Sequence, residues 1–358
     1  MSVPEAIQKD AEFQNHIRIG INGFGRIGRC MARLIFNNPN CSIEIVGIND
    51  LGSPEALAHL LEYDSVHGRW NARISFDSKS IIINGQVIPL ISEENPENLE
   101  WGKLNVDAVV ESTGRFKTSE SAQGHILAGA KRVLITAVAS GEKIKTIVIG
   151  ANENLLDGTE SIISNASCTT NCAAPLVDII DDLCGIESGY ITTIHSYTSD
   201  QTLHDRPHAD LRRARAAALS IIPTSTGAAK AITRIFPALE GRLGGAGIRV
   251  PVPNGSLTDV TYIVKKSVSR EKINRAFLDA ATSGKWNGIL EYTEKPIVSS
   301  DVIGNAHSCV FDAQLTSVIG NMVKVVGWYD NEMGYSARLI DLLEYWSKLW
   351  ESNRKVAV

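Results

Sequence analysis

The sequence of 358 residues lacks several features that would mark large classes of protein. It contains no run of about 18 apolar residues, so we expect no transmembrane helix and no membrane partner. Residues 1–15 are polar and acidic, unlike a secretory signal peptide, and we interpret them as an N-terminal extension without an assigned role. The net charge of −5 lacks the basic excess of many nucleic-acid-binding proteins, so we expect no nucleic-acid partner.

Cysteine is scarce, because six residues in this length are too few for a disulfide scaffold. None forms a C-x-x-C pair or a zinc-finger spacing with histidine, so we expect no metal site and a reducing, cytoplasmic location. Cys30, Cys41, Cys184 and Cys309 lie in apolar patterns and are interpreted as core or surface residues. Cys172 is interpreted as a buried small residue in preference to a resolving thiol.

The remaining composition is that of an ordinary globular chain, with 44% apolar and 21% charged residues, and the length predicts about two domains. Over 16–166, short apolar runs alternate with helical segments, which predicts an α/β dinucleotide-binding domain of Rossmann type. Over 167–332, a long helix and alternating strands predict an α+β catalytic and oligomerisation domain with a mixed or antiparallel sheet. We expect the C-terminal helix, about 333–351, to pack back on the first domain.

The individual elements follow from apolar runs and their spacing. Pro175 lies inside the long helix and should kink it or remove a backbone hydrogen bond. The strands expected in the first domain are His16–Asn22, Ile43–Ile48, Ala108–Val110, Val133–Ile135 and Ile147–Ile149.

A glycine-rich turn joins the first expected strand to a helix. Gly23, Gly25 and Gly28 form the pattern G-x-G-x-x-G, whose glycines allow the backbone to approach a pyrophosphate at a helix N-terminus. Asp50 follows the next strand, roughly 20 residues further on, where a carboxylate binds ribose hydroxyls. We interpret this unit as a dinucleotide site in preference to a tight structural turn. A mononucleotide or flavin site is the alternative.

Cys168 is the candidate nucleophile, because it lies at the expected start of a helix. Free N–H groups and the helix dipole stabilise a thiolate there, so we expect the Cys168 pKa to lie below the free value of about 8.5. His195 ends the apolar strand Tyr190–Ile194 and is a candidate base. Spacing alone leaves open the alternative that both are ordinary interior residues.

Hydroxyl groups and arginines are concentrated between residues 192 and 249, and this is the chemistry of phosphate binding. A solvated or subunit-facing basic loop is the alternative, and Arg212 and Arg215 are assigned to packing or oligomer contacts. The candidates for anion binding are Thr198, Arg213 and Arg249.

Together these motifs resemble those of phosphorylating glyceraldehyde-3-phosphate dehydrogenases, from about Ile17 to Leu349. The resemblance rests on ordered motifs at 21–29 (INGFGRIGR), 166–172 (ASCTTNC), 225–230 (STGAAK) and 328–335 (WYDNEMGY). It implies NAD-linked oxidation of glyceraldehyde 3-phosphate in glycolysis or gluconeogenesis. Cys168 would form a thiohemiacetal and then a thioester, with His195 as the base and inorganic phosphate as the final acceptor.

The resemblance also implies a set of binding residues and a homotetramer, in which the loop 197–220 reaches a neighbouring subunit's cofactor. The substrate phosphate would be held by Thr198 and Arg249, and the attacking phosphate by Ser167, Thr169, Arg213, Thr226 and Gly227. The NAD contacts would be Gly23, Gly25, Arg26, Ile27, Gly28, Asp50, Thr113, Thr136, Asn331 and Tyr335.

Two departures and two alternatives accompany the resemblance. Arg206 lies where NAD-dependent members often have an apolar residue, so we expect strong NAD preference with weak use of NADP. The stretch around Glu94 lacks the basic residue that often approaches the adenine. Erythrose-4-phosphate dehydrogenase is the nearer alternative, although the intact 225–229 segment argues against it. A non-catalytic nucleotide- or RNA-binding protein is the distant one.

Overall fold

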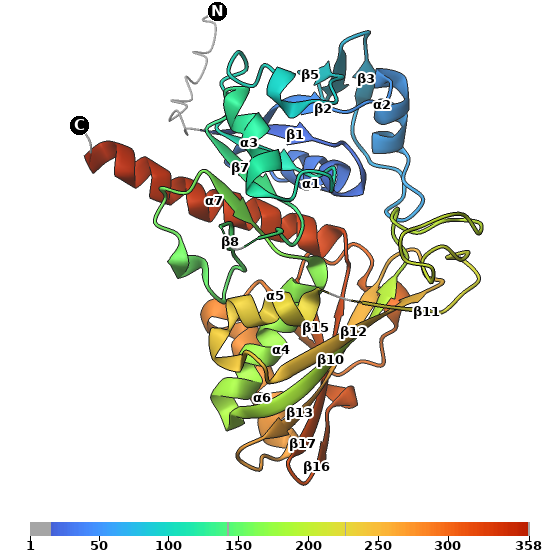
Figure 1. The fold of residues 1–358 in the computed structure, drawn as a ribbon, viewed down its shortest axis with the longest axis vertical. Coiled ribbons are helices and arrows are strands. Elements are labelled where there is room, and N and C mark those ends of the chain that lie inside the picture. The colour runs from blue at the N-terminus through green and yellow to red at the C-terminus, as the bar shows by residue number, and fades with distance from the viewer. Residues whose placement is uncertain (1–15, 142, 226, 357–358) are drawn as a thin grey trace, which may run out of the picture.

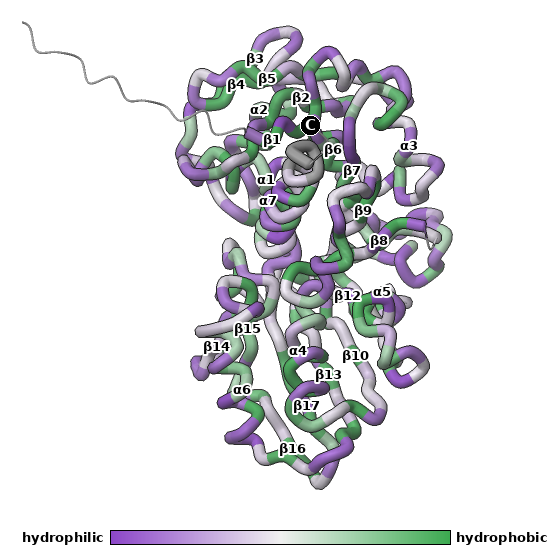
Figure 2. The backbone as a smooth tube through the Cα atoms, turned by 90° about the vertical axis from the view of Figure 1, so that its left-hand side faces the viewer, coloured by the Kyte–Doolittle hydropathy of each residue, from purple (hydrophilic) through white to green (hydrophobic). Residues whose placement is uncertain are grey.

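The computed structural model describes residues 16–141, 143–225 and 227–356, so the predicted N-terminal extension lies outside the described residues. Figure 1 shows two bodies, each built around one β-sheet. The first body comprises β1 to β9 with the long helix α7 (Met333–Val356), and the second comprises α4 to β17. Hydrophobic segments run through the interior of both bodies, while hydrophilic segments are frequent in the outer turns (Figure 2).

The nine-stranded sheet of the first body has the order β3-β4-β5-β2-β1-β6-β7-β9-β8. The strands from β5 to β8 pair in parallel, while β3, β4 and β5 pair in an antiparallel manner. The strands are β1 Ile17–Asn22, β2 Ile43–Asn49, β3 Ile74–Phe76, β4 Ser80–Ile83, β5 Gln86–Ile91, β6 Ala108–Glu111, β7 Arg132–Ile135, β8 Lys145–Thr146 and β9 Ile162–Ser164. The helices are α1 Arg26–Asn37, α2 Pro54–Glu62 and α3 Ser119–Leu127.

The central strands of this sheet are buried because they are apolar on both faces, as parallel strands covered by helices require. Helix α7 packs against α1, and Leu339, Leu342 and Trp346 share one buried cluster with Met31 and Ile35. The last helix of the chain therefore completes the core of the first body.

The eight-stranded sheet of the second body is mixed, with β11-β12-β10-β13-β17-β15-β14 in order and β16 paired to β17. Helices α4 Cys168–Cys184, α5 Ala228–Ile235 and α6 Arg270–Thr282 lie beside it (Figure 1). The strands are β10 Ile186–Ser196, β11 Ile222–Thr224, β12 Leu243–Val250, β13 Ser256–Val264, β14 Leu290–Thr293, β15 Cys309–Asp312, β16 Ser317–Ile319 and β17 Met322–Tyr329. The predicted fold class, a Rossmann-type α/β part followed by an α+β part with a mixed sheet, is confirmed.

One strand prediction is wrong. Ile147–Ile149 is not a strand, since β8 ends at Thr146. The Asn152 side chain accepts from the Val148 N–H at 2.8 Å and donates to the Thr146 carbonyl at 2.9 Å. These backbone groups therefore pair with a side chain, and Ile147 and Val148 are apolar because they lie in the core.

The prediction that Cys172 is buried is confirmed, whereas the kink or lost hydrogen bond expected at Pro175 stays a prediction. All six cysteines are free, and every one except Cys168 is buried. Helix α4 continues through Pro175, as expected for a helix stabilised by the burial of its surroundings. Among the described residues, the structure offers no helix with the length and apolar character needed to cross a bilayer.

Candidate active site

A cavity of about 1030 Å³ lies between the two bodies and is lined by residues of both. Nearly all the predicted site residues that the structure describes line this cavity, and Gly28 is the exception. Thr226 lies outside the described residues. The predicted residues that line it are Gly23, Gly25, Arg26, Ile27, Asp50, Thr113, Thr136, Ser167, Cys168, Thr169, His195, Thr198, Arg213, Gly227, Arg249, Asn331 and Tyr335.

The glycine turn has the shape that a dinucleotide needs. Gly23 has φ +91°, a conformation that favours glycine. A Cβ on Gly28 would lie 2.7 Å from the Gly23 carbonyl oxygen, whereas a Cβ on Gly25 would meet nothing within 4 Å. Gly25 caps α1 without a side-chain hydrogen bond, so the first N–H groups of α1 are suited to bind a pyrophosphate. The lack of a side chain at Gly28 thus allows α1 to pack closely on the turn, and the lack of one at Gly25 leaves room for a ligand to approach the backbone.

Asp50 braces the glycine turn from the end of β2. Its Oδ2 accepts from the Phe24 N–H at 2.7 Å, and its Oδ1 accepts from the Gly52 N–H at 2.9 Å. Each carboxylate oxygen can accept a further hydrogen bond, and Asp50 lines the cavity. It can therefore accept from a ribose diol without releasing the turn.

The Arg26 side chain is bound by carboxylates, which its sequence motif did not reveal. Its guanidinium donates to Glu332 at 2.5 and 2.8 Å and to Asp64. Burial acts to lower the Arg26 pKa, but these two acids raise it overall. Ligand-type atoms of Cys30, His67 and Glu332 lie within 4.8 Å of one another here. Because Arg26 donates to both Glu332 oxygens and burial raises the Cys30 pKa, these groups are poorly suited to bind a metal ion.

Cys168 and His195 meet across the cavity floor, with Sγ 3.4 Å from Nε2. Cys168 begins α4, and the Ser167 hydroxyl caps that helix by accepting from the Thr170 N–H at 3.1 Å. Ala166, just before the cap, has φ +56°, which is rare outside glycine and places the helix start under local strain. Cys168 and His195, which lie 27 residues apart in the sequence, are therefore in contact at the N-terminus of α4.

The expectation of a lowered thiol pKa is wrong. Desolvation raises the Cys168 pKa to about 11, although the Arg249 guanidinium acts in the opposite direction. Desolvation also lowers the His195 pKa to about 3, and Arg249 adds to that shift. Burial therefore outweighs the lowering influence of Arg249 on the thiol pKa, and both groups are neutral before a ligand binds.

Arg249 controls which ring nitrogen of His195 carries the proton. The Ser196 carbonyl oxygen, 2.7 Å from Nδ1, favours Nδ1–H and leaves the Nε2 lone pair toward Cys168. The Arg249 guanidinium, 2.6 Å from Nδ1, is a donor only and favours the opposite tautomer. His195 is thus a competent base toward Cys168 once Arg249 moves from Nδ1.

Two other predicted anion ligands, Arg213 and Thr169, already have protein partners. Arg213 donates to Asp200 and, at 2.9 Å, to the Thr224 hydroxyl. The Thr169 hydroxyl lies 2.9 Å from the Tyr329 hydroxyl. Arg212 and Arg215 do not line the cavity, in line with their assignment to other contacts.

Asn331 and Tyr335 lie where the second body meets α7. The Asn331 Oδ1 accepts from the hydroxyls of Ser196 and Ser256, at 2.8 and 3.0 Å, so its amide nitrogen is the end suited to a ligand. The Tyr335 hydroxyl donates to the Ala166 carbonyl at 3.0 Å, which ties α7 to the approach to Cys168.

Asp200 and Glu332 are site residues that sequence reasoning missed. Each binds an arginine that the sequence had singled out, Arg213 and Arg26 respectively. The available signal was an acid next to a predicted site residue, since Glu332 follows Asn331 directly in the chain.

Comparisons with known proteins identify the family to which the chain is similar. Residues 17–119 match the family described as "Glyceraldehyde 3-phosphate dehydrogenase, NAD binding domain", and residues 167–331 match its C-terminal domain. A glyceraldehyde-3-phosphate dehydrogenase of Mycobacterium avium is 53% identical over 332 residues, covering 91% of this chain and 97% of that protein. One of Geobacillus stearothermophilus is 52% identical over 331 residues, covering 92% and 98%.

Proposed function

Because this chain belongs to the glyceraldehyde 3-phosphate dehydrogenase family, we propose that Cys168 and His195 are its catalytic pair. The chain is an NAD-dependent oxidoreductase of that type, with glyceraldehyde 3-phosphate and inorganic phosphate as substrates. The observation that carries the proposal is the 3.4 Å contact between Sγ and Nε2 in a cavity that also contains the glycine turn. The relatives' names support this activity, and nothing favours erythrose-4-phosphate dehydrogenase.

The chemistry begins as Sγ bonds to the aldehyde carbon, while the Cys168 proton passes through His195 Nε2 to the carbonyl oxygen and gives a thiohemiacetal. The thiohemiacetal hydroxyl then returns its proton to the free Nε2 of His195 as the carbon loses a hydride and becomes a thioester. NAD supplies the hydride acceptor when it is bound. Phosphate attack on the thioester carbon breaks the carbon–sulfur bond and releases the acyl phosphate, and the departing Cys168 sulfur takes the proton from His195.

The residues present fit NAD. The open face of Gly25 and the start of α1 would hold the pyrophosphate, and Asp50 would accept from the ribose hydroxyls. The Asn331 amide nitrogen and the Tyr335 ring would position the nicotinamide end near Cys168. Arg26 contributes its backbone N–H at the start of α1, because its side chain is held by Glu332 and Asp64.

Two anion pockets are proposed on the predicted residues. Thr198 and Arg249 hold the substrate phosphate, while Arg213, together with Ser167, Thr169, Thr226 and Gly227, holds the attacking phosphate. A phosphate that draws Arg249 away from His195 Nδ1 also restores the tautomer in which Nε2 is the base. Substrate binding and activation of the base are thereby linked.

A direct assay tests the function. NADH formation with glyceraldehyde 3-phosphate should require added phosphate, and one equivalent of iodoacetamide should label Cys168 first and abolish turnover. The same assay with erythrose 4-phosphate should give much slower turnover. Labelling of Cys172 or Cys309 first with activity retained would remove Cys168 from the mechanism.

We propose that the chain forms a homotetramer in the cytoplasm. The loop 197–221, which extends beside β11 in Figure 1, exposes Leu203 by 73%, Leu211 by 82%, Leu219 by 84% and Ile221 by 71%. Such a concentration of apolar side chains is typical of a surface that a partner covers. The free cysteines support a reducing compartment. Light scattering after gel filtration should give four times the chain mass.

The proposed division of labour follows the two bodies. Residues 16–166, with the helix predicted at about 333–351, would bind the cofactor, while 167–332 would carry catalysis and subunit contacts. The cluster shared by α1 and α7 supports this division.

A further inference from the structure

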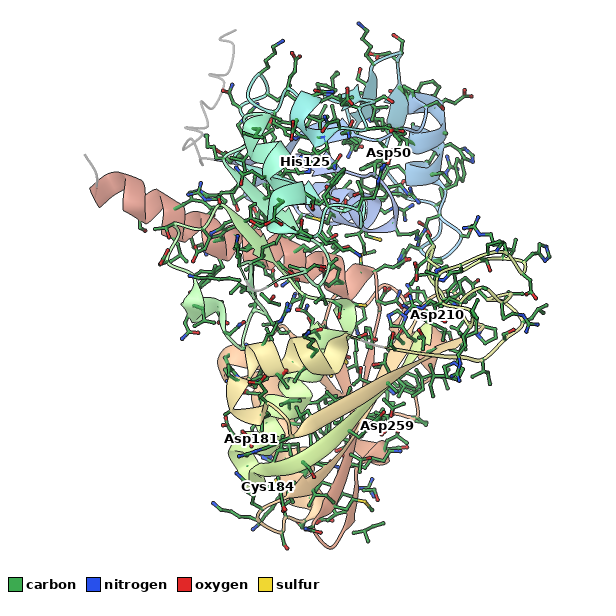
Figure 3. All side chains as sticks on the ribbon, in the orientation of Figure 1. Asp50, His125, Asp181, Cys184, Asp210 and Asp259 are labelled. Carbon is green, nitrogen blue, oxygen red and sulfur yellow. The ribbon has the colours of Figure 1, made fainter. Side chains whose placement is uncertain are left out.

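A buried polar network lies beneath the glycine turn and was not singled out by any sequence motif. Its central residues are Glu111, the last residue of β6, and His125, in α3, and both side chains are fully buried. Figure 3 labels His125 in the first body, far from the loop that carries Asp210. Buried polar groups are stable only when their hydrogen bonds are made, so the partners of this pair define what it does.

Trp101 fixes the protonation of His125. The Trp101 indole Nε1–H can only donate, and it lies 3.1 Å from His125 Nδ1. Nδ1 must therefore be the acceptor, which places the ring proton on Nε2. Nε2 lies 3.0 Å from Glu111 Oε2 and donates to it. His125 is thus a neutral imidazole that presents one N–H to the carboxylate.

Every acceptor position of Glu111 faces a donor. Oε2 also accepts from the Asn22 amide at 2.6 Å. Oε1 accepts from the Thr113 N–H at 2.9 Å and from the Thr113 hydroxyl, whose own oxygen accepts from the Arg115 N–H at 3.0 Å. With donors on both oxygens, Glu111 acts as an acceptor only, as a carboxylate does.

The network ends at the wall of the cofactor cavity. A Cβ on Gly23 would lie 2.8 Å from the Thr113 nitrogen, so Thr113 packs directly on the glycine turn. The Ser112 hydroxyl donates to the Gly23 carbonyl at 2.7 Å. Ser112, Thr113 and Arg115 all line the cavity, whereas Glu111 and His125 do not. The pair can therefore act on a ligand only through its neighbours, which are the 112–115 turn and Asn22, a Glu111 partner that also lines the cavity.

We propose that Glu111 and His125 are positioning residues for NAD binding, which fix the 112–115 turn against the glycine turn. The inference rests on the proposed function of this cavity as the NAD site. Since neither side chain reaches the cavity, the pair sets the affinity for NAD and leaves the chemical step at Cys168 unchanged.

Three substitutions test the pair. In Glu111→Gln, either orientation of the amide points its NH₂ at two donors, so the Kd for NAD should rise about 10–100-fold. His125→Leu removes one donor and should raise the Kd roughly tenfold. His125→Gln keeps an N–H for Glu111 and should stay within about threefold of the wild type. The kcat at saturating NAD should remain near the wild-type value in all three.

Asp178→Asn is the matched control. Asp178 is a buried carboxylate of the second body that accepts from the Trp286 indole at 2.7 Å and from Lys285 at 2.8 Å. It should lower the Tm and leave the Kd for NAD unchanged. Calorimetric titration with NAD and thermal unfolding of each full-length variant give both quantities.

The outcomes separate the two proposals. The positioning role would be overturned if Glu111→Gln and His125→Leu lowered the Tm as Asp178→Asn does but kept the wild-type Kd for NAD. If Glu111→Gln does not fold, the contrast between His125→Leu and His125→Gln decides, and equal Kd values for those two would overturn it. Failure of the wild-type chain to bind NAD would instead contradict the proposed cofactor site.

Discussion

In the first body, Glu111 receives a donor at every acceptor position, whereas in the second body Arg249 lies against a histidine and Arg213 against Asp200. The first arrangement is complete without a ligand, and the second has partners that an anion must displace. Binding costs least where the site is preformed. The first body can therefore bind the cofactor without rearranging these contacts. In the second body, the arginines must exchange their present partners for the anionic substrate.

The contrast extends to charge. The glycine turn presents backbone N–H groups and is braced by Asp50, so little needs to move when a pyrophosphate arrives. Around Cys168, burial keeps both the thiol and the imidazole neutral, and the reactive charge has to be created by proton transfer. Substitutions of His195, Arg213 and Arg249 should therefore change rates and substrate affinities while NAD affinity is retained.

The largest effect should come from His195. His195→Asn removes the only base that contacts the Cys168 thiol in the part of the chain that the structure describes. We expect kcat to fall by roughly 10²–10⁴, the usual contribution of a positioned acid–base group. Single-turnover NADH formation measures the loss, and calorimetric titration should give an unchanged Kd for NAD. Full turnover in the variant would contradict the assignment.

Arg249 should follow in size. Arg249→Leu should raise the aldehyde KM by about 30–1,000-fold, equivalent to about 2–4 kcal/mol, because a buried anion loses its partner. Arg213→Leu should instead weaken saturation by phosphate, which separates the two pockets. Arg215→Leu is the matched control, since Arg215 pairs with Asp205 on the exposed loop. Equal effects of the Arg249 and Arg213 variants on the aldehyde KM alone would contradict the separation.

Local patterns predicted much of this architecture because the residues that form it are neighbours in sequence. The alternation of apolar runs and helices, the glycine turn and the helix start at Cys168 were all readable in this way. The 3.4 Å approach of His195 depends on how β10 lies beside α4, which spacing alone could not decide. The run at 147–149 misled because burial in a loop also selects apolar residues.

The partners of the charged groups were the least predictable part. Arg26 and Glu332 are 306 residues apart, yet they are bonded in the structure. The raised Cys168 pKa likewise reflects desolvation by residues from distant segments. From the sequence, only the position of Cys168 at the start of a helix could be predicted. Glu111 and His125 carry no recognisable motif, because their role depends on Trp101 and Thr113 from neighbouring segments.

Acid should destabilise the fold through His195. Its pKa is about 3 when folded, against 6.5 as its ordinary value, so between these values the unfolded chain binds a proton that the folded chain excludes. Stability present above pH 6.5 is therefore lost as the pH falls, by up to about 1.4 kcal/mol per pH unit. Between pH 6.5 and 5, the free energy of unfolding should fall by about 2 kcal/mol more in the wild type than in His195→Asn. Urea unfolding at the two pH values measures this difference. An equal fall in the free energy of unfolding for the wild type and His195→Asn would contradict a neutral buried His195.

The smallest effect should come from Arg206. Asp50 would repel a 2′-phosphate by about 4 kcal/mol at a separation of ~4 Å and an effective dielectric of ~20, which corresponds to at most roughly 10³-fold preference for NAD. Arg206 is exposed on the 197–221 loop and does not line its own chain's cavity, so it can offset this repulsion only by reaching a neighbouring subunit's ribose. Arg206→Leu should therefore lower the weak NADP activity several-fold and leave kcat/KM with NAD nearly unchanged. Steady-state assays with both cofactors measure this, and Arg212→Leu on the same loop is the control. An unmodified chain that uses NADP as efficiently as NAD would show that Asp50 does not set the selectivity.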